Sequence, residues 1–406
     1  MRILHISTRL ILGGSQENTV LSCEGQARLG HEVHLAFGPI YGPEGSLLER
    51  VEGFRTDDDR RITTHLVPHM IRRIDPIADP RCYFELRGLI RRIRPDIVHT
   101  HSSKAGIIGR HAAWHEGGSR GRPGVVHTIH GPPFHPYEKR WRNSLYIAME
   151  RIAARHCHAI VSVADAMTKQ FLDARIGHRE QYATVYSGME IEPFLNAALG
   201  ESRDAVRASL GLAPDAVVIG TVGRLAEHKG HDDLIDALAD DLRANDRWRL
   251  LWVGDGWWRG RLTERLDRAG IRDRVVLTGL VPPQRVPGLI RAMDVLVHPS
   301  YREGLPRTVP QALLAGVPVV AYDVDGTCEA CIDFKTGRLV APGIIAGLRD
   351  AVRWMIEDPA RARATADAGR ELCRERFDAR RMVEELEKVY ARALASRVQS
   401  ATASPA

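Results

Sequence analysis

The sequence predicts an α/β protein made of two doubly wound domains, each with a parallel sheet covered by helices. Two observations lead to this fold class. The chain has 406 residues, which is long for a single core. Short apolar runs alternate with amphipathic stretches, and this alternation starts again near residue 216. The carboxyl ends of parallel strands carry the ligand-binding loops, so we expect the two domains to face a cleft.

The first set of elements is expected before residue 190. Buried strands are predicted at 2–7, 31–37, 96–101, 125–130 and 159–164, where short apolar runs occur. Helices are predicted at 17–30 and 83–94. Gly30 and Pro95 mark the ends of these two helices, since glycine caps a helix and proline stops one.

The second set of elements begins after a segment with few strand signals, residues 190–215, which we interpret as a linker. Strands are predicted at 216–225, 249–256, 275–280, 295–300 and 317–323, with helices at 233–244, 258–270 and 286–294. We therefore expect one domain over 1–190 and another over 205–377. A last helix at about 378–396 is followed by a small, polar tail, 397–406, which we expect to fray.

The segment from Glu303 to Val320, EGLPRTVPQALLAGVPVV, is the most informative part of the chain. Glu303 is a carboxylate at a loop tip and suits sugar hydroxyls, while Gly304 lets a ligand approach the backbone. The helix that follows opens with unpaired amides, which favour an anion such as phosphate. A sugar joined to a diphosphate needs both features.

Two further loops of the second set carry candidate ligand-binding residues. Arg224 and Lys229 lie in GRLAEHKG, after the strand at 216–225, and together would suit a diphosphate. The order of a Walker loop is missing there, and a solvated surface pair is the alternative. Gly254, in VGDGW, follows the next strand and could border a nucleobase through its backbone.

The first set offers weaker signals. GGSQEN includes Gly14 and opens the first helix, with Ser15 as the expected N-cap; it reads as a helix-start turn or as a backbone cradle for phosphate. His130 follows a strand and could donate to a sugar or accept a proton, although a structural histidine is the simpler reading. His101, Ser102 and Lys104 end a neighbouring strand and could meet an acceptor.

Charge and cysteine content limit the partners. Residues 1–190 hold 26 Lys and Arg against 20 Asp and Glu, so this half is basic and could meet an anionic membrane surface. The pair Cys328 and Cys331 lacks the second pair of a structural zinc site, and we expect no metal.

Aromatic side chains do not alternate with the basic residues as in nucleic-acid binders. No apolar run of about 18 residues occurs, and we expect a cytoplasmic chain, with possible contact to the inner face of the membrane.

Taken in order, GGSQEN, TIHG, GRLAEHKG, VGDG and REGLPRTVPQALLAGVPVV resemble the retaining glycosyltransferases of family 4. The resemblance covers about residues 1–377 and is specific only as a combination. It implies the GT-B fold, with two Rossmann-like domains. The first domain would bind the acceptor and the second the nucleotide-sugar donor, with the last helix packed back on the first domain.

The resemblance also implies roles for residues. His130, Arg224, Lys229 and Glu303 would be catalytic: His130 beside the donor sugar, the two cations on the departing diphosphate, and Glu303 on the sugar hydroxyls. The donor would also meet Gly14, Gly254, Leu305, Pro306, Thr308 and Gln311. The acceptor would be a glycan or lipid-linked glycan, as in polysaccharide biosynthesis, and no metal or other cofactor would be needed.

One position departs from the family pattern. The second acid of the E-x7-E motif falls on Gln311, which forms hydrogen bonds but carries no charge. A catalytically silent nucleotide-sugar or glycan-binding homologue is therefore an alternative to the transferase, and a nucleotide-sugar epimerase is another. The sequence leaves open whether the donor carries UDP or GDP.

Overall fold

The computed structural model describes residues 1–41, 45–116 and 123–402, with side chains described as far as residue 396. The chain divides into two compact units. Unit 1 comprises Met1–Met189 and the chain from Ala379 onward, and unit 2 comprises Glu190–Asp378. Each unit is described by itself.

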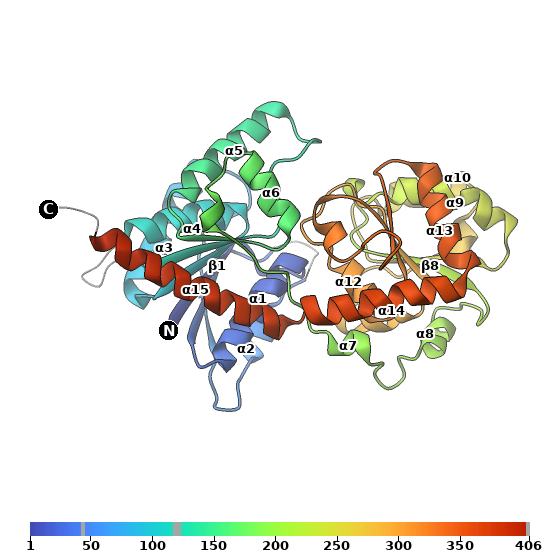
Figure 1. The fold of residues 1–406 in the computed structure, drawn as a ribbon, viewed down its shortest axis with the longest axis horizontal. Coiled ribbons are helices and arrows are strands. Elements are labelled where there is room, and N and C mark those ends of the chain that lie inside the picture. The colour runs from blue at the N-terminus through green and yellow to red at the C-terminus, as the bar shows by residue number, and fades with distance from the viewer. Residues whose placement is uncertain (42–44, 117–122, 403–406) are drawn as a thin grey trace. The chain divides into compact units, whose positions relative to one another are not determined.

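Unit 1 has a parallel sheet with the strand order β3-β2-β1-β4-β5-β6-β7 in its described part. The strands are β1 (Arg2–Ser7), β2 (Glu32–Phe37), β3 (Ile62–Leu66), β4 (Ile97–His101), β5 (Gly124–Ile129), β6 (Ala159–Ser162) and β7 (Tyr182–Thr184). The helices are α1 (Gly14–Arg28), α2 (Leu48–Gly53), α3 (Ala78–Ile93), α4 (Ser103–His115), α5 (Arg140–Ala154), α6 (Asp165–Asp173) and α15 (Ala379–Thr402) (Figure 1).

Side-chain parity assigns the helices of unit 1 to opposite faces of this sheet. Ile3 belongs to an apolar cluster with residues of α15, such as Val383 and Leu386. Ile6, three positions on and therefore on the other face, lies against Gly109 of α4. Helix α15 packs beside α1 and over β5 and β6, so a segment from the far end of the chain completes this core (Figure 1).

Unit 2 has a second parallel sheet, with the order β10-β9-β8-β11-β12-β13 among its described strands. The strands are β8 (Val217–Val222), β9 (Trp248–Val253), β10 (Val275–Leu277), β11 (Val295–His298), β12 (Val319–Tyr322) and β13 (Arg338–Val340). The helices are α7 (Glu192–Leu195), α8 (Arg203–Ser209), α9 (His231–Ala244), α10 (Arg259–Arg268), α11 (Val286–Arg291), α12 (Thr308–Leu314), α13 (Ile345–Glu357) and α14 (Pro359–Arg376). Short 3₁₀ turns occur at Arg179–Gln181 in unit 1 and at Glu227–Lys229, Arg272–Arg274, Pro283–Arg285 and Asp325–Glu329 in unit 2.

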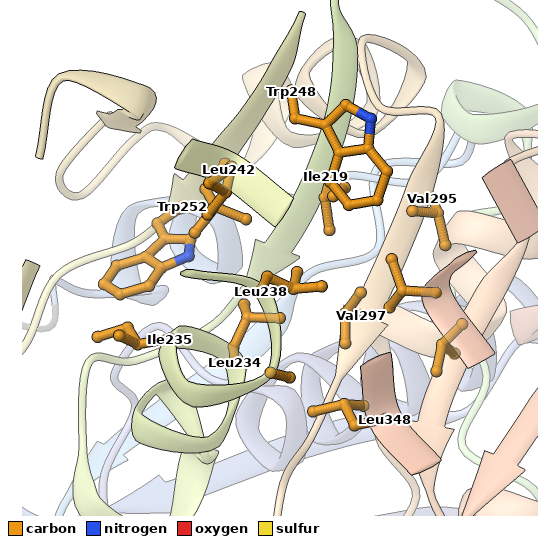
Figure 2. Packing of buried hydrophobic residues seen from close by; sticks show 14 of the residues in the cluster. Ile219, Leu234, Ile235, Leu238, Leu242, Trp248, Trp252, Val295, Val297 and Leu348 are labelled. Atoms are coloured by element: carbon orange, nitrogen blue, oxygen red, sulfur yellow. The ribbon is translucent and has the colours of Figure 1, made fainter. Parts of the chain in front are cut away.

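The core of unit 2 explains why its strands read as continuous apolar runs. Figure 2 shows Leu234 and Leu238 of α9 gathered with Ile219 of β8, Val297 of β11 and Leu348 of α13. All five side chains are fully buried. A parallel sheet is covered on both faces, so alternation of polar and apolar residues is lost along its strands.

The observed elements differ from the expected ones at the sheet edges and at the end of the chain. Strands β3, β7 and β13 are short edge strands, which an apolar run does not mark. Residues 190–215 are not a bare linker, since they form α7 and α8. Helix α15 continues to Thr402, past the expected end at 396, because proline is absent until position 405. Of the predicted tail, residues 403–406 lie outside the described part.

Candidate functional site

The loops after β8 and β11 carry the central site residues of unit 2. Strand β8 ends at Val222, and its loop contains Arg224 and Lys229; β11 ends at His298, and its loop contains Glu303. The two strands are parallel neighbours. Their carboxyl ends therefore lie at the same edge of the sheet, and their loops meet there.

A close approach at Gly230 joins these loops. Gly230 has φ of 65°, and a Cβ at this position would lie 1.9 Å from the carbonyl oxygen of Pro299. The amide of Tyr301 donates to the carbonyl of His228 at 2.8 Å, and the Ser300 hydroxyl donates to the same oxygen at 3.1 Å. Glycine is required both by the backbone conformation and by the contact.

Lys229 and Glu303, which lie on these two joined loops, form an ion pair that is shielded from water. Lys229 Nζ lies 2.5 Å from Glu303 Oε1, and the two side chains are 19% and 14% exposed. His298 Nε2 lies 3.1 Å from the same oxygen. Burial opposes the charged carboxylate, but the Lys229 charge and the hydrogen bonds from His298 and Lys229 together hold the pKa of Glu303 well below its usual range. The carboxylate is thus ionised at neutral pH.

Further hydrogen bonds fix the pair in place. The other ring nitrogen of His298, Nδ1, lies 3.2 Å from the Thr308 hydroxyl. The amide of Glu303 donates to Asp325 Oδ2 at 2.7 Å. Burial raises the pKa of Asp325. Thr308, predicted as a donor-binding residue, therefore acts in this structure on the ring that orients Glu303.

Arg224 and Gly254 lie in a second pair of joined loops. The Arg224 guanidinium lies over the Trp257 ring, 5.5 Å from its centroid. Gly254 has φ of 134°, and a Cβ there would lie 2.1 Å from the carbonyl oxygen of Gly223. The Leu225 amide donates to the carbonyl of Asp255 at 3.1 Å. Gly254 thus keeps the Arg224 loop against the loop after β9.

The Leu305–Gln311 segment differs from the expectation in its details. Helix α12 begins at Thr308 and has seven residues, so the amides ahead of it belong to a loop. Pro306 has no amide hydrogen, and the side chains of Leu305 and Pro306 are buried, so these two residues anchor the loop. Pro310 occupies the first turn of α12, where a missing N–H costs little. Gln311 lies in α12 and is half-buried.

In unit 1, the structure corrects the expectation for the candidate acceptor residues. His101 is 1% exposed, and both of its ring nitrogens meet other histidines, His5 at 2.9 Å and His130 at 3.0 Å. Lys104 Nζ donates to the carbonyl of Arg73 at 2.8 Å and to the Asp79 carboxylate. The side chains of His101 and Lys104 are therefore engaged within the fold rather than presented to a ligand.

Ser102, the third candidate acceptor residue, and Gly14 lie at helix starts in unit 1. The Ser102 hydroxyl lies 2.7 Å from that of Thr8, and Ser102 has φ of 64°, a strained value outside glycine. Gly14 is exposed in the first turn of α1, as expected. The N-cap of α1 is Gly13 rather than Ser15, because the helix begins at Gly14; Ser15 lies in its first turn and its hydroxyl donates to Gln16 Oε1 at 2.9 Å.

Several residues that shape these sites are missing from the sequence-based prediction. His298 and Asp325 support Glu303, and His5 lies behind the hydrogen-bonded pair of His101 and His130. A histidine at the end of an apolar strand is the only sequence signal for His298. Within the described residues, one ring nitrogen from each of His5, His99 and His101 lies within 4.8 Å of the other two, an arrangement that no spacing motif indicated.

Comparison with family models assigns both halves of the chain. Residues 202–372 match the model of glycosyl transferases group 1, and residues 12–192 match that of glycosyltransferase family 4. The chain therefore belongs to the group 1 glycosyltransferases. The predicted resemblance to glycosyltransferases is confirmed.

Curated relatives agree with this assignment. The 2-deoxystreptamine glucosyltransferase of Streptomyces kanamyceticus is 33% identical over 239 residues, which cover 59% of this chain and 61% of the relative. The 2-deoxystreptamine N-acetyl-D-glucosaminyltransferase of Streptomyces fradiae is 31% identical over 296 residues, 69% of this chain and 67% of the relative. A UDP-Gal:alpha-D-GlcNAc-diphosphoundecaprenol alpha-1,3-galactosyltransferase of Escherichia coli is 29% identical, with 66% and 68% covered.

Solved structures confirm the predicted fold. HepE of Anabaena, in complex with UDP and glucose, superposes with a TM-score of 0.80 at 21% identity, covering 96% of this chain and 99% of that one. Sucrose-phosphate synthase from Thermosynechococcus elongatus gives 0.82 at 20% identity, covering 98% and 100%. The chain thus has the GT-B fold, with two Rossmann-like domains.

The Lys229–Glu303 pair makes the stability of the chain depend on pH. The folded-state pKa of Glu303 lies below its unfolded value of about 4.3. The contribution of the pair to the free energy of unfolding is therefore complete above that value and is lost as the pH falls through the folded-state pKa. We expect Glu303→Gln to lower the urea midpoint relative to the parent chain by about the same amount at pH 7 and pH 5, and by less at pH 3.5.

Glu264→Gln is the matched control, because Glu264 is an exposed carboxylate of the same unit. Its urea midpoint should follow that of the parent chain at every pH. A gap for Glu303→Gln that stays constant or widens between pH 5 and pH 3.5 would contradict the assignment.

Proposed function

We propose that this chain transfers a sugar from a nucleotide-diphosphate sugar to a glycan or lipid-linked acceptor, with retention of anomeric configuration. The observation that carries the proposal is the Lys229–Glu303 pair at the carboxyl ends of neighbouring strands. It couples a cation, suited to a leaving diphosphate, to a carboxylate suited to sugar hydroxyls. Membership of the glycosyltransferase family supports the same reaction class.

UDP is the donor nucleotide that we propose. The Escherichia coli relative is named for UDP-Gal, and the Anabaena neighbour was solved with UDP. The acceptor names of the relatives differ, from 2-deoxystreptamine to a diphosphoundecaprenol-linked sugar, so they support an acceptor rich in hydroxyls without selecting one.

The proposed chemistry follows from charge. Loss of the diphosphate builds negative charge on the scissile oxygen, and Lys229 with Arg224 would stabilise this charge more in the transition state than in the ground state. Glu303, held ionised, would accept hydrogen bonds from the sugar. In a retaining reaction the acceptor hydroxyl attacks the face from which the diphosphate departs, and the leaving phosphate takes its proton. Metal independence remains part of the proposal.

The reaction is tested by product analysis. UDP, GDP, ADP and TDP are first compared by thermal shift, because a bound ligand stabilises the fold by mass action, and UDP should give the largest increase in Tm. UDP-sugars are then incubated with acceptors, and UDP release and the anomeric configuration of the product are measured. Conversion of the donor without an acceptor would favour the epimerase, and nucleotide binding without UDP release would favour a silent homologue.

We expect Lys229→Ala and Glu303→Ala each to lower kcat/KM for transfer by at least about 100-fold, the scale of losing one charge-stabilising group. Lys335→Ala is the matched control, since Lys335 is an exposed lysine of the same unit. Circular dichroism and Tm show whether each variant folds. Turnover close to that of the parent chain in both folded variants would remove the pair from the catalytic site.

We also propose that helix α5 of unit 1 contacts an anionic membrane surface. Trp141, Leu145 and Ile152 are exposed on α5 at helical spacing, at 62%, 44% and 51%. Lys139 and Arg140 are exposed beside them. Apolar side chains flanked by cations suit an interfacial helix. None of the described helices is long and apolar enough to span a bilayer.

The double variant Trp141→Ser, Leu145→Ser should lower the partition of the protein onto vesicles of phosphatidylcholine with 30% phosphatidylglycerol by at least about tenfold, because burial of two large apolar side chains is lost. Flotation measures the bound fraction. Leu280→Ser, at a position 60% exposed in unit 2, is the control and should bind as the parent chain does. The contact would be refuted if the bound fractions of all three proteins were equal, or if none of the three bound to the vesicles.

A further inference from the structure

A chain of hydrogen bonds runs through the core of unit 1 from His130 to helix α1. His130 Nε2 lies 3.0 Å from His101 Nδ1, and His101 Nε2 lies 2.9 Å from His5 Nδ1. His5 Nε2 lies 2.7 Å from Gln26 Oε1. His130 directly follows β5, and Gln26 belongs to α1. The hydrogen bonds therefore connect the carboxyl end of the sheet to a helix on its face.

A second branch begins at the same amide. Gln26 Nε2 donates to Tyr390 Oη at 2.9 Å, and Tyr390 Oη lies 2.6 Å from His99 Nδ1. His99 Nε2 lies 2.6 Å from Thr128 Oγ1. Tyr390 belongs to α15, so the two helices that cover this face meet at Gln26.

The interior residues of this hydrogen-bonded network are buried and uncharged. His5, His99, Gln26 and Tyr390 are completely buried, and His101 is 1% exposed. Burial lowers the pKa of His5 to about 4, with the Gln26 hydrogen bond opposing this shift. Burial, together with the neighbouring histidines, also lowers the pKa values of His99 and His101. Each ring therefore carries one N–H and one lone pair at neutral pH.

The direction of every hydrogen bond follows from the Gln26 amide. Its oxygen can only accept, so His5 Nε2 carries the proton and His5 Nδ1 accepts. His101 Nε2 must then donate to His5, which leaves His101 Nδ1 as an acceptor. His130 Nε2 must donate to His101, so the lone pair of neutral His130 lies on Nδ1.

Tyr390 determines which way the Gln26 amide points. Gln26 Nε2 can only donate, so Tyr390 Oη accepts from it, and the hydroxyl hydrogen is left to donate to His99 Nδ1 while the amide oxygen accepts from His5. A reversed amide would require the opposite proton on every ring. The two branches therefore change together, and Gln26 is the point that couples them.

We propose that Gln26 and Tyr390 are positioning residues that hold His130 in the tautomer with its proton on Nε2 and its lone pair on Nδ1. For its effect on catalysis the inference rests on the proposed function, together with the place beside the donor sugar that the family resemblance implies for His130. His130 Nδ1 then accepts a hydrogen bond from a hydroxyl group and does not donate one.

The tautomer is measured without reference to activity. Protein labelled with ¹⁵N-histidine gives long-range ¹H–¹⁵N correlations that distinguish an Nε2–H ring from an Nδ1–H ring, and the His130→Asn spectrum assigns the His130 signals. We expect His5, His99, His101 and His130 all to be Nε2–H. In Gln26→Leu, the signals of His130 should move toward a mixture of tautomers. In Tyr390→Phe, which preserves the ring and its packing, His99 and His130 should both shift.

The control is Gln170→Leu, on α6 of the same unit, which should leave all four rings unchanged. We expect kcat of folded Gln26→Leu to fall at least about tenfold, with KM for the donor within about twofold, as when an interaction acts mainly in the transition state. A shifted tautomer with unchanged kcat would uphold the positioning role and remove His130 from the proposed reaction.

Two results would overturn the inference itself. One is a His130 that is Nδ1–H in the parent chain or insensitive to both variants. The other is about one equivalent of zinc in the purified protein by elemental analysis, because a cation among His5, His99 and His101 would take the lone pairs that these hydrogen bonds use.

Discussion

The ion pair between Lys229 and Glu303 is the interaction on which the arrangement of the unit 2 loops depends. Both side chains are largely shielded from water, so each charge needs the other. Removing one partner of such a pair typically costs about 3–5 kcal/mol, because an uncompensated charge remains. The pair in turn requires the contact at Gly230, which brings the loop after β8 onto the loop after β11. The positive φ of Gly230 and the shielded pair of Lys229 and Glu303 thus both hold the loop after β8 against the loop after β11.

The two units bury polar groups in different ways. Unit 2 keeps opposite charges together, with His298 and Thr308 satisfying the remaining hydrogen bonds. Unit 1 also buries an ion pair, Arg110 with Glu150, and in addition it buries a chain of neutral histidines in which each ring meets a neighbour. Both solutions avoid an unpaired polar group in the core. Their consequences differ, because a charge pair provides a strong local field, whereas a chain of neutral rings transmits the direction of its hydrogen bonds.

The sequence alone predicted the parts of this structure that depend on local pattern. Apolar runs marked the central strands of both sheets, and the segment at Glu303 with the loop at Lys229 indicated the residues that the structure brings together. Edge strands β3, β7 and β13 were missed, because polar residues interrupt their short sequences and leave no apolar run. Contacts between distant segments were also inaccessible: Gln26 and Tyr390 lie 364 positions apart and show no motif. His101 was predicted to meet an acceptor, and its burial was not foreseen, because the end of a strand does not reveal which side chains turn into the core.

Unit 1 cannot complete its core until helix α15, which is synthesised last, is available to cover one face of its sheet. Met382, Val383 and Leu386 belong to the same apolar cluster as Ile3 and Val126. A ribosome that has just completed residue 189 has therefore exposed a sheet with part of one face uncovered. That face stays open while unit 2 is translated, and it closes only when residues 379–396 leave the exit tunnel. The nascent protein must pass through an intermediate with an accessible apolar sheet, which is the kind of surface that chaperones recognise.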